Sequence, residues 1–227
     1  MVIASLMPPG VAVADATGPL PGEALLPEEE PLVARAVAAR RAEFTTVRAC
    51  ARLALAELGR PPAPLLSGPK REPLWPEGIV GSLTHCDGYR AAAVAPADLL
   101  ASLGIDAEPH AALPDGILER VSLPRERDGL GRLPAGIHWG RLLFSAKESV
   151  YKTWFPLTHR WLDFDEAALE FRPGPDPARG TFLAEVLVPG MAVAGRPVRL
   201  LHGRYAVGGG LLATAITLPA AQDPGDG

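Results

Sequence analysis

Apolar residues recur at helical spacing between residues 31 and 58. This period predicts an amphipathic helix. Pro31 suits a first helical turn, the acidic run before it favours the positive end of the helix dipole, and Gly59 with the prolines after it ends the helix. The predicted buried face consists of Val33, Val37, Phe44, Val47, Ala51, Leu55 and Leu58.

Short apolar runs replace the helical period after a proline-rich connection at residues 60–78. They predict strands, and the turn residues Asp87 and Gly88 between the first two runs predict a hairpin. The predicted strands are 79–84, 90–95 and 103–108. Residues 1–30 predict an irregular segment or a short strand, and residues 109–136 are loop-rich.

The second half of the chain repeats this order of helix and strands. A helix is predicted from His138 or Trp139 to Phe155, and Pro156 is expected to end it. An antiparallel meander is predicted at 167–171, 181–188, 204–207 and 211–218.

The order of elements predicts an α+β fold of two lobes, residues 1–109 and 110–227. A chain of 227 residues, of which 48% are hydrophobic, can bury one sizeable core or two smaller joined cores. The last residues, 220–227, predict a disordered tail.

Charge and hydropathy argue against nucleic acid and membrane partners. Lys and Arg number 22 and Asp and Glu 26, which gives a net charge of −4, and no basic run is present. No apolar run reaches the roughly 20 residues that a membrane helix needs, and the N-terminus lacks the basic start of a secretory signal. We therefore expect a cytoplasmic protein. Cys50 and Cys86 have no C-x-x-C partner and are expected to be buried thiols.

Two carboxylates, Asp106 and Glu108, lie two residues apart on a predicted strand and therefore face the same side. Adjacent carboxylates repel each other, and Mg²⁺ held by carboxylates and waters relieves the repulsion. On this pair alone, a solvated strand edge with alternating charge is the preferred alternative.

Lysine is rare, and two of the three lysines, Lys147 and Lys152, lie on the predicted second helix. Ser145, Glu148 and Lys152 share one face of this helix, whereas Lys147 projects to one side. The functional interpretation is a third carboxylate for the metal and ammonium groups for phosphate oxygens. The alternative is an exposed Glu–Lys pair, worth about 0.3–0.5 kcal/mol.

Thr84 and His85 lie where the first predicted strand ends at a turn. No triad partners lie nearby in the sequence, so nucleophilic catalysis has little support. Phosphate binding by these two residues and a structural histidine are the alternatives.

Arginines form a stripe on the predicted first helix. Arg41, Arg48 and Arg52 are spaced seven and four residues apart, and Arg40 lies nearer the apolar face. Their head groups either lie in water above the core edge or border a cleft and bind an anion.

Three motifs in order carry a family resemblance: Gly81–Cys86, Gly104–Glu108 and Phe144–Lys152. Together they resemble the 4'-phosphopantetheinyl transferases of the larger, pseudo-dimeric class, which includes the surfactin-type and enterobactin-type synthetase activators. The similarity is closest to actinobacterial members and spans roughly residues 31 to 165. It implies two similar α/β lobes with antiparallel sheets, related by pseudo-two-fold symmetry, with the active site at their interface.

The resemblance also implies a reaction. The 4'-phosphopantetheine group of coenzyme A is transferred to a serine of an apo acyl, peptidyl or aryl carrier protein of fatty acid, polyketide or nonribosomal peptide synthesis. The other product is 3',5'-ADP. The resemblance further implies a monomer that uses Mg²⁺, with Mn²⁺ as a second possibility. A Mg²⁺-dependent phosphodiesterase and a non-catalytic module that binds coenzyme A or a nucleotide are the rival functions.

Residue roles follow from the resemblance, position by position. The implied metal ligands are Asp106, Glu108 and Glu148. The implied pyrophosphate ligands are Lys152 and, as a second candidate, Lys147. The implied contacts of the 3'-phosphate and the adenosine are Arg40, Arg48, Thr84, His85, Gly68, Lys70 and Arg71. Trp161 is a candidate for flanking the pantetheine arm.

Two questions stay open at this stage. Glu148 is the preferred base for the serine proton, and Glu108 is the alternative. The sequence departs from the family pattern at Phe144, where Trp is frequent, and at Glu72, where Lys is frequent. The departure at Glu72 leaves open whether Lys70 or Arg71 supplies the positive charge of that loop.

Overall fold

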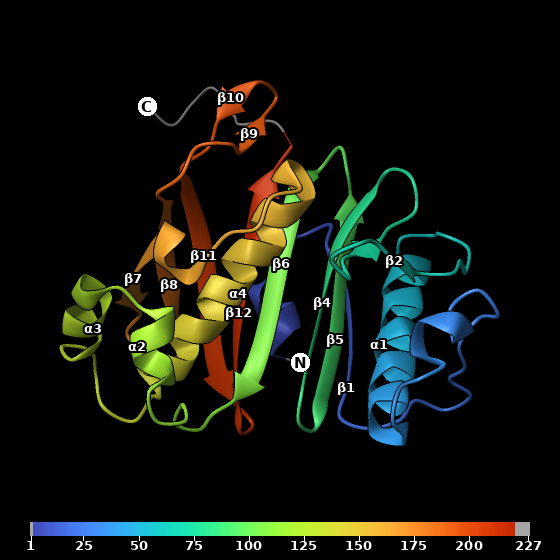
Figure 1. Ribbon diagram of the computed structural model, residues 1–227, viewed down its shortest axis with the longest axis horizontal. Coiled ribbons are helices and arrows are strands. Elements are labelled where there is room, and N and C mark those ends of the chain that lie inside the picture. Colours follow the sequence, from blue (N-terminus) through green and yellow to red (C-terminus); the bar gives the residue numbers. More distant parts are fainter. Residues whose placement is uncertain (1, 221–227) are drawn as a thin grey trace.

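The computed structural model describes residues 2–220 and contains two larger antiparallel sheets side by side, together with two small two-stranded sheets, β2-β3 and β9-β10 (Figure 1). The first sheet has the order β1-β5-β4, and helix α1 packs on it. The second has the order β6-β12-β11-β8-β7, and helix α4 packs on β6 and β12. The α+β class with antiparallel sheets is therefore confirmed, and the repeated pairing of one long helix with one sheet fits a pseudo-two-fold organisation.

The first half contains one long helix. Its elements are β1 (Ala12–Ala16), α1 (Ala38–Glu57), β2 (Leu66–Ser67), β3 (Pro73–Leu74), β4 (Ile79–Cys86), β5 (Tyr89–Pro96) and β6 (Leu100–Pro109). The predicted hairpin is confirmed, because β4 and β5 pair around Asp87 and Gly88. Gly88 has a φ of +70°, which glycine adopts without strain.

The second half contributes four of the five strands of the larger sheet, whose edge strand β6 comes from the first half. Its elements are α2 (Ile117–Val121), α3 (Pro124–Leu130), α4 (Trp139–Thr158), β7 (Ala167–Pro173), β8 (Arg179–Val186), β9 (Ala192–Val193), β10 (Arg196–Pro197), β11 (Leu200–Gly208) and β12 (Leu211–Pro219). The four predicted strands of the meander correspond to β7, β8, β11 and β12. The predicted tail lies outside the described residues from position 221 onward. No helix within residues 2–220 is long and apolar enough to cross a membrane.

The first helix starts later than the periodicity predicts. Residues 30–33 form a separate 3₁₀ turn, and Val37, a predicted buried residue, is 72% exposed. The cause is Glu29, whose buried carboxylate accepts hydrogen bonds from the backbone N–H groups of Leu26 and Leu65 and pairs with Arg52. These contacts hold the preceding segment across the helix instead of in line with it.

Two further boundaries differ from the prediction. The connection expected to be loop contains α2 and α3, and α3 begins with Pro124 at its first turn and the Glu126 carboxylate accepting the N–H of Leu123. Helix α4 continues past Pro156 and ends at Thr158, where His159 adopts a left-handed conformation. Pro156 is exposed near the end of the helix, so its ring breaks one hydrogen bond without stopping the last turn.

The strands β4 and β6 are neighbours that belong to different sheets, and we call their contact the β4–β6 seam (Figure 1). Side-chain hydroxyls join them: Ser82 Oγ accepts the Ile105 N–H at 3.1 Å, and Thr84 Oγ1 accepts the Ala107 N–H at 3.0 Å. The contacts advance by two residues on each strand, so β4 and β6 run in the same direction.

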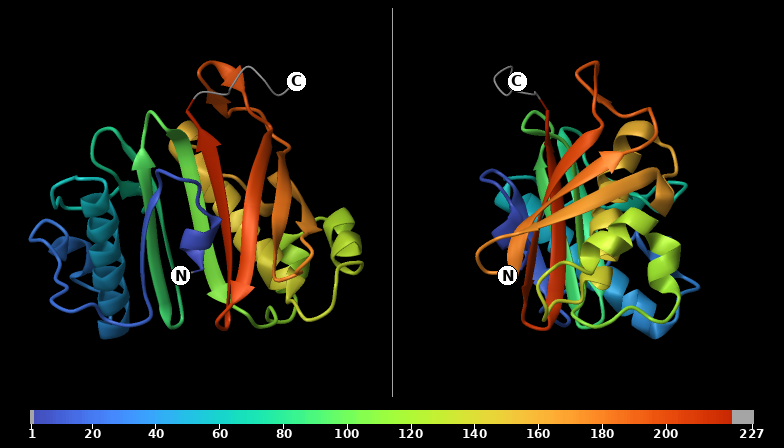
Figure 2. Two further views of the ribbon diagram at one scale, coloured as in Figure 1. Left: turned by 180° about the vertical axis from the view of Figure 1, so that it is seen from behind. Right: turned by 90° about the vertical axis from the view of Figure 1, so that its left-hand side faces the viewer.

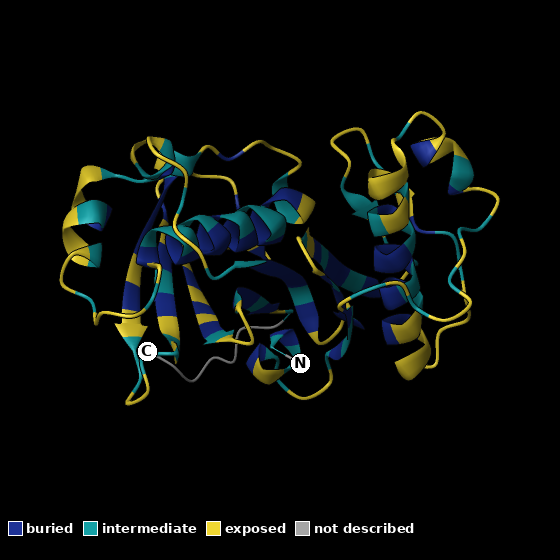
Figure 3. Cartoon of the chain, turned by 90° about the horizontal axis from the view of Figure 1, so that it is seen from below, coloured by how far each residue is buried: buried dark blue, intermediate teal, exposed yellow. Residues whose placement is uncertain are grey.

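An N-terminal 3₁₀ turn, Ile3–Leu6, contacts β1 of the first sheet and β11 and β12 of the second, and Figure 2 shows it across the back of the molecule. It buries Ile3 and Leu6 between the two sheets. Most of α4 is buried or half-buried, whereas exposed residues gather on the loops and on α3 (Figure 3).

Candidate active site

A cleft of about 520 Å³ lies between α1, the β2–β3 loop, β4 and the second half of α4. Its lining includes seven of the residues proposed from the sequence: Arg40, Arg48, Lys70, Arg71, His85, Glu148 and Lys152. The structure therefore brings together side chains from two of the three motifs, Gly81–Cys86 and Phe144–Lys152, with basic residues of α1 and of the β2–β3 loop.

Arg48 is the buried cation of this cleft. Its guanidinium carbon lies 3.4 Å from the centroid of the Phe44 ring, and Nη2 donates to Ser67 Oγ at 3.3 Å. Its Nε is buried and has no hydrogen-bond partner among the described residues. Burial lowers the pKa of Arg48 to about 10, so the group stays charged at neutral pH. An unused donor on a buried cation is suited to an anionic ligand.

Arg40 and His85 form a second basic group, with Arg40 Nη1 at 2.6 Å from His85 Nε2. Burial lowers the pKa of His85 below its ordinary value, and the positive charge of Arg40 lowers it further. Glu43 lies 3.4 Å from Arg40 and 3.8 Å from both His85 and Arg90, and it lines the cleft. Sequence reasoning missed Glu43, although it follows Arg40 by three residues on one helix face.

The loop that carries Lys70 is closed by its own glutamate. Gly68 N–H donates to Glu72 O and Lys70 N–H donates to Glu72 Oε2, both at 2.8 Å. A Cβ atom at Gly68 would lie 2.0 Å from Glu72 Oε1, so a larger residue there would displace this carboxylate. Lys70 and Arg71 both line the cleft, and the choice between them therefore stays open.

The three predicted metal ligands have different partners. Asp106 Oδ1 accepts hydrogen bonds from Lys152 Nζ at 2.7 Å and from Thr84 Oγ1 at 3.2 Å. Asp106 Oδ2 is buried and, within residues 2–220, has no partner. Glu108 Oε2 pairs with Arg141 Nη1 at 2.9 Å. Sequence reasoning missed Arg141, although it precedes Glu148 by two helical turns on the same face of α4.

Glu148 is the least engaged carboxylate. Its side chain forms no hydrogen bond or ion pair within residues 2–220, and it lines the cleft. Burial raises its pKa above the ordinary value, Lys152 lowers it, and the charges of Asp106 and Glu108 raise it. Burial and the charge of Asp106 likewise raise the pKa of Glu108. The negative charges of neighbouring carboxylates thus raise the pKa of both glutamates.

The donor set suits a hard divalent cation. Within residues 2–220 no group of three or more His, Cys, Asp or Glu side chains is arranged to hold a metal ion. Lys152 pairs with Asp106, and Arg141 pairs with Glu108. The unpartnered Asp106 Oδ2 and the free Glu148 are oxygen ligands of the kind Mg²⁺ prefers. These residues therefore fit the metal that the resemblance implies.

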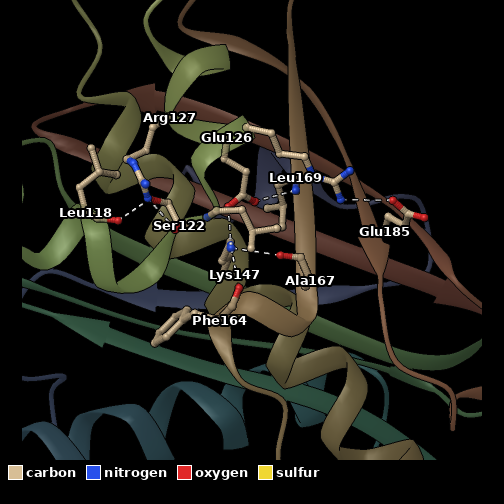
Figure 4. A network of polar contacts seen from close by, with 11 residues as sticks. Leu118, Ser122, Glu126, Arg127, Lys147, Phe164, Ala167, Leu169 and Glu185 are labelled. Carbon is tan, nitrogen blue, oxygen red and sulfur yellow. Dashed lines mark hydrogen bonds and ion pairs between the residues drawn. The ribbon is translucent and has the colours of Figure 1, made fainter.

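Lys147 does not reach the cleft. Its ammonium group is buried behind α4, where it donates to Glu126 Oε2 at 2.8 Å, to Phe164 O at 2.6 Å and to Ala167 O at 3.1 Å (Figure 4). All three donors of the ammonium group are used, so none is left for a pyrophosphate. The structure does not support Lys147 as a pyrophosphate ligand, because side chains around α4 bury it on the far side of the helix.

Besides Lys147, five other predicted residues border the site without lining the cleft: Gly68, Thr84, Asp106, Glu108 and Trp161. Thr84 is 2% exposed and faces the β4–β6 seam, so it does not line the cleft, and its place beside the adenosine stays a prediction. Trp161 is exposed and lies with its ring centroid 5.0 Å from that of Tyr151, a cleft residue that the sequence reasoning did not single out. Its contact with a pantetheine arm stays a prediction.

Comparison with known proteins now identifies the family. Residues 28–95 match the 4'-phosphopantetheinyl transferase N-terminal domain, and residues 102–188 match the 4'-phosphopantetheinyl transferase superfamily. The chain belongs to the 4'-phosphopantetheinyl transferase family. The activity of this family, and of this chain, is transfer of the phosphopantetheine group of coenzyme A to carrier proteins.

Two actinobacterial relatives of this transferase match along almost their whole length, and an enterobactin synthase component matches over about half of its length. The chain is 51% identical over 222 residues to 4'-phosphopantetheinyl transferase PptT of Mycobacterium tuberculosis, which covers 96% of this chain and 98% of the relative. It is 54% identical over 225 residues to 4'-phosphopantetheinyl transferase Svp of Streptomyces mobaraensis, covering 96% and 90%. It is 36% identical over 119 residues to enterobactin synthase component D of Salmonella typhimurium, covering 50% and 47%. The resemblance to actinobacterial transferases is thus confirmed.

Proposed function

We propose that the cleft between α1 and α4 carries out this transfer, with coenzyme A bound by its basic residues and a divalent cation bound by Asp106, Glu108 and Glu148. One observation carries the proposal: Arg48 Nε and Asp106 Oδ2 are the two buried side-chain N or O atoms without a partner among the described residues. One is cationic and the other anionic. Leaving both unpaired is costly, and an anionic substrate with its cation would satisfy both.

The basic residues divide into two proposed roles. Arg40, Arg48 and His85 lie on α1 and β4 and bind the 3'-phosphate, with the Lys70 loop beside them. Lys152 lies on α4 beside Asp106 and neutralises the pyrophosphate.

In the proposed reaction, the carrier serine Oγ attacks the β-phosphorus of coenzyme A. A new P–O bond forms to serine, the bond between that phosphorus and the bridging oxygen breaks, and 3',5'-ADP leaves with the electron pair. When bound, Mg²⁺ supplies positive charge that stabilises the phosphoryl oxygens and the leaving group.

The serine proton goes to Glu148 in this proposal. Glu148 has no ion-pair partner within residues 2–220, whereas Glu108, the alternative base, is held by Arg141.

The two lobes, residues 1–109 and 110–227, meet at this cleft in our proposal. Support comes from its lining, which combines α1 and β4 from the first lobe with α4 from the second. Because one chain supplies all these residues, we propose a monomer. We further propose that it acts in the cytoplasm on apo carrier proteins, with Mg²⁺ or Mn²⁺ and without nucleic acid or a membrane.

Intact-mass analysis tests the proposal. An apo carrier protein incubated with the chain, coenzyme A and Mg²⁺ should gain one phosphopantetheine group on a serine and release an equal amount of 3',5'-ADP. A chelator should stop the gain, and added Mg²⁺ should restore it. Release of 3',5'-ADP without carrier modification would instead support a phosphodiesterase. Binding of coenzyme A with neither product would support a non-catalytic module.

A further inference from the structure

The Thr84 hydroxyl makes two contacts at the β4–β6 seam, and both lead to β6. It accepts the N–H of Ala107 at 3.0 Å, and it lies 3.2 Å from Asp106 Oδ1. A hydroxyl has one proton, and the Ala107 N–H occupies a lone pair of the oxygen. The proton of Thr84 is therefore left for Asp106, and the buried position shields this bond from water.

The Asp106 carboxylate is held on one side only. Oδ1 accepts from both Thr84 and Lys152, whereas Oδ2 is buried and has no partner within residues 2–220. Two donors on the same oxygen fix the rotation of the carboxylate about its Cβ–Cγ bond. The free oxygen consequently has one orientation, which a cation can use without first ordering the side chain.

Thr84 and Lys152 hold Asp106 with different electrostatic effects. Lys152 brings a positive charge that competes with a cation for the carboxylate. Thr84 is neutral, so it orients the carboxylate while leaving its negative charge available to a metal. Thr84 therefore orients the Asp106 carboxylate, whereas Lys152 also neutralises its charge.

We propose that Thr84 is a positioning residue, which orients the Asp106 carboxylate so that Oδ2 can bind the divalent cation. The inference rests on the proposed metal site, and it replaces the role beside the adenosine that the resemblance implies for Thr84. Ser82 provides a matched comparison, because it makes the same kind of bond, to the Ile105 N–H on the same strand, without touching Asp106.

Mn²⁺ binding, measured by electron paramagnetic resonance with and without coenzyme A, tests the role without turnover. Thr84→Val keeps the shape but removes the hydroxyl, and we expect about tenfold weaker Mn²⁺ binding. Thr84→Ser should restore binding to near the wild-type value. Ser82 itself lines the cleft, so this control is compared without coenzyme A. Ser82→Ala should then lower the melting temperature, as Thr84→Val does, while leaving the Mn²⁺ affinity unchanged.

Asp106→Asn separates two ways in which the inference can fail. If Asp106→Asn loses Mn²⁺ binding but Thr84→Val binds like the wild type, the role of Thr84 is wrong and the metal site stands. If wild type and Asp106→Asn bind Mn²⁺ equally, or neither binds it, the metal site itself is wrong. Equal weakening in Thr84→Val and Ser82→Ala would show that Thr84 only stabilises the seam. Thr84→Ala makes the same comparison if Thr84→Val shows no cooperative unfolding.

Discussion

Two ion pairs on opposite sides of α4 show how the same residue types serve different purposes. Lys147 pairs with Glu126 at 2.8 Å, with side chains 2% and 1% exposed. Lys152 pairs with Asp106 at 2.7 Å, with side chains 26% and 7% exposed. The lengths are almost equal, so distance does not separate a structural pair from a site pair.

The difference lies in how completely each carboxylate is bound. Glu126 uses both oxygens, since Oε1 accepts the Leu169 N–H and Oε2 accepts Lys147 and the Leu123 N–H. Asp106 uses only Oδ1. A saturated pair has nothing left for a ligand, whereas an unsaturated one does. Hydrogen-bond saturation therefore distinguishes the two lysines better than sequence position does.

The largest expected effect is on turnover at the unsaturated pair. Asp106→Asn keeps an oxygen for Thr84 and Lys152 but replaces the free carboxylate oxygen by an NH₂ group, which cannot bind a cation. We expect kcat/KM to fall about 1000-fold, or ~4 kcal/mol. The free energy of unfolding should change little, because repulsion with Glu108 and Glu148 is relieved.

Glu126→Gln is the matched carboxylate-to-amide control for this variant. Its correctly folded fraction should keep a kcat near that of the wild type. The hydrogen-bond partners of Glu126 are Lys147, Leu123 and Leu169, and none of them lines the cleft. A kcat in Asp106→Asn equal to that in Glu126→Gln would contradict the assignment of Asp106 as a metal ligand.

The saturated pair should instead govern stability. Lys147→Met leaves the buried Glu126 charge without its counterion, which we expect to lower the free energy of unfolding by about 3 kcal/mol. Chemical denaturation measures this loss. The double variant Lys147→Met/Glu126→Gln should recover part of it, since the uncompensated charge is gone. If Lys147→Met instead leaves the stability unchanged and raises the KM for coenzyme A, Lys147 is a pyrophosphate ligand after all.

Local sequence patterns predicted much of the fold. The hairpin at Asp87 and Gly88 and the strand that carries Asp106 and Glu108 follow from turn chemistry and alternation, which are short-range properties. The start of α1 does not, because it depends on Glu29 reaching Leu65. Long-range contacts of this kind leave no periodic signal.

In the candidate site too, short-range patterns could be predicted from the sequence and long-range contacts could not. Spacing and resemblance predicted that Arg48, His85 and Glu148 share a site, and all three line one cleft. Spacing also showed that Lys147 projects to one side of the helix, but it could not show that Glu126, 21 residues earlier, fills that side. The seam contact of Thr84 with Asp106 joins two strands of different sheets, and no local pattern predicts that register.

The smallest expected effect is the pH dependence of coenzyme A binding at the basic group of Arg40 and His85, which contrasts with the two ion pairs of α4. Burial and then Arg40 lower the pKa of His85 in the free protein, which favours its neutral form. If a 3'-phosphate binds beside it, the added negative charge raises that pKa, and binding takes up a proton. The affinity for coenzyme A should therefore increase as pH falls from about 7.5 to about 6.5, above the second pKa of the phosphate itself. The change in affinity cannot exceed about tenfold per pH unit for one proton.

The KM for coenzyme A, determined as a function of pH, measures this change. His85→Gln and dephospho-coenzyme A are the two controls, and each should flatten the slope. A wild-type KM that is already flat over this range would mean that His85 contacts the substrate as a neutral hydrogen-bond donor, or not at all, and would leave Arg48 as the main ligand of the 3'-phosphate.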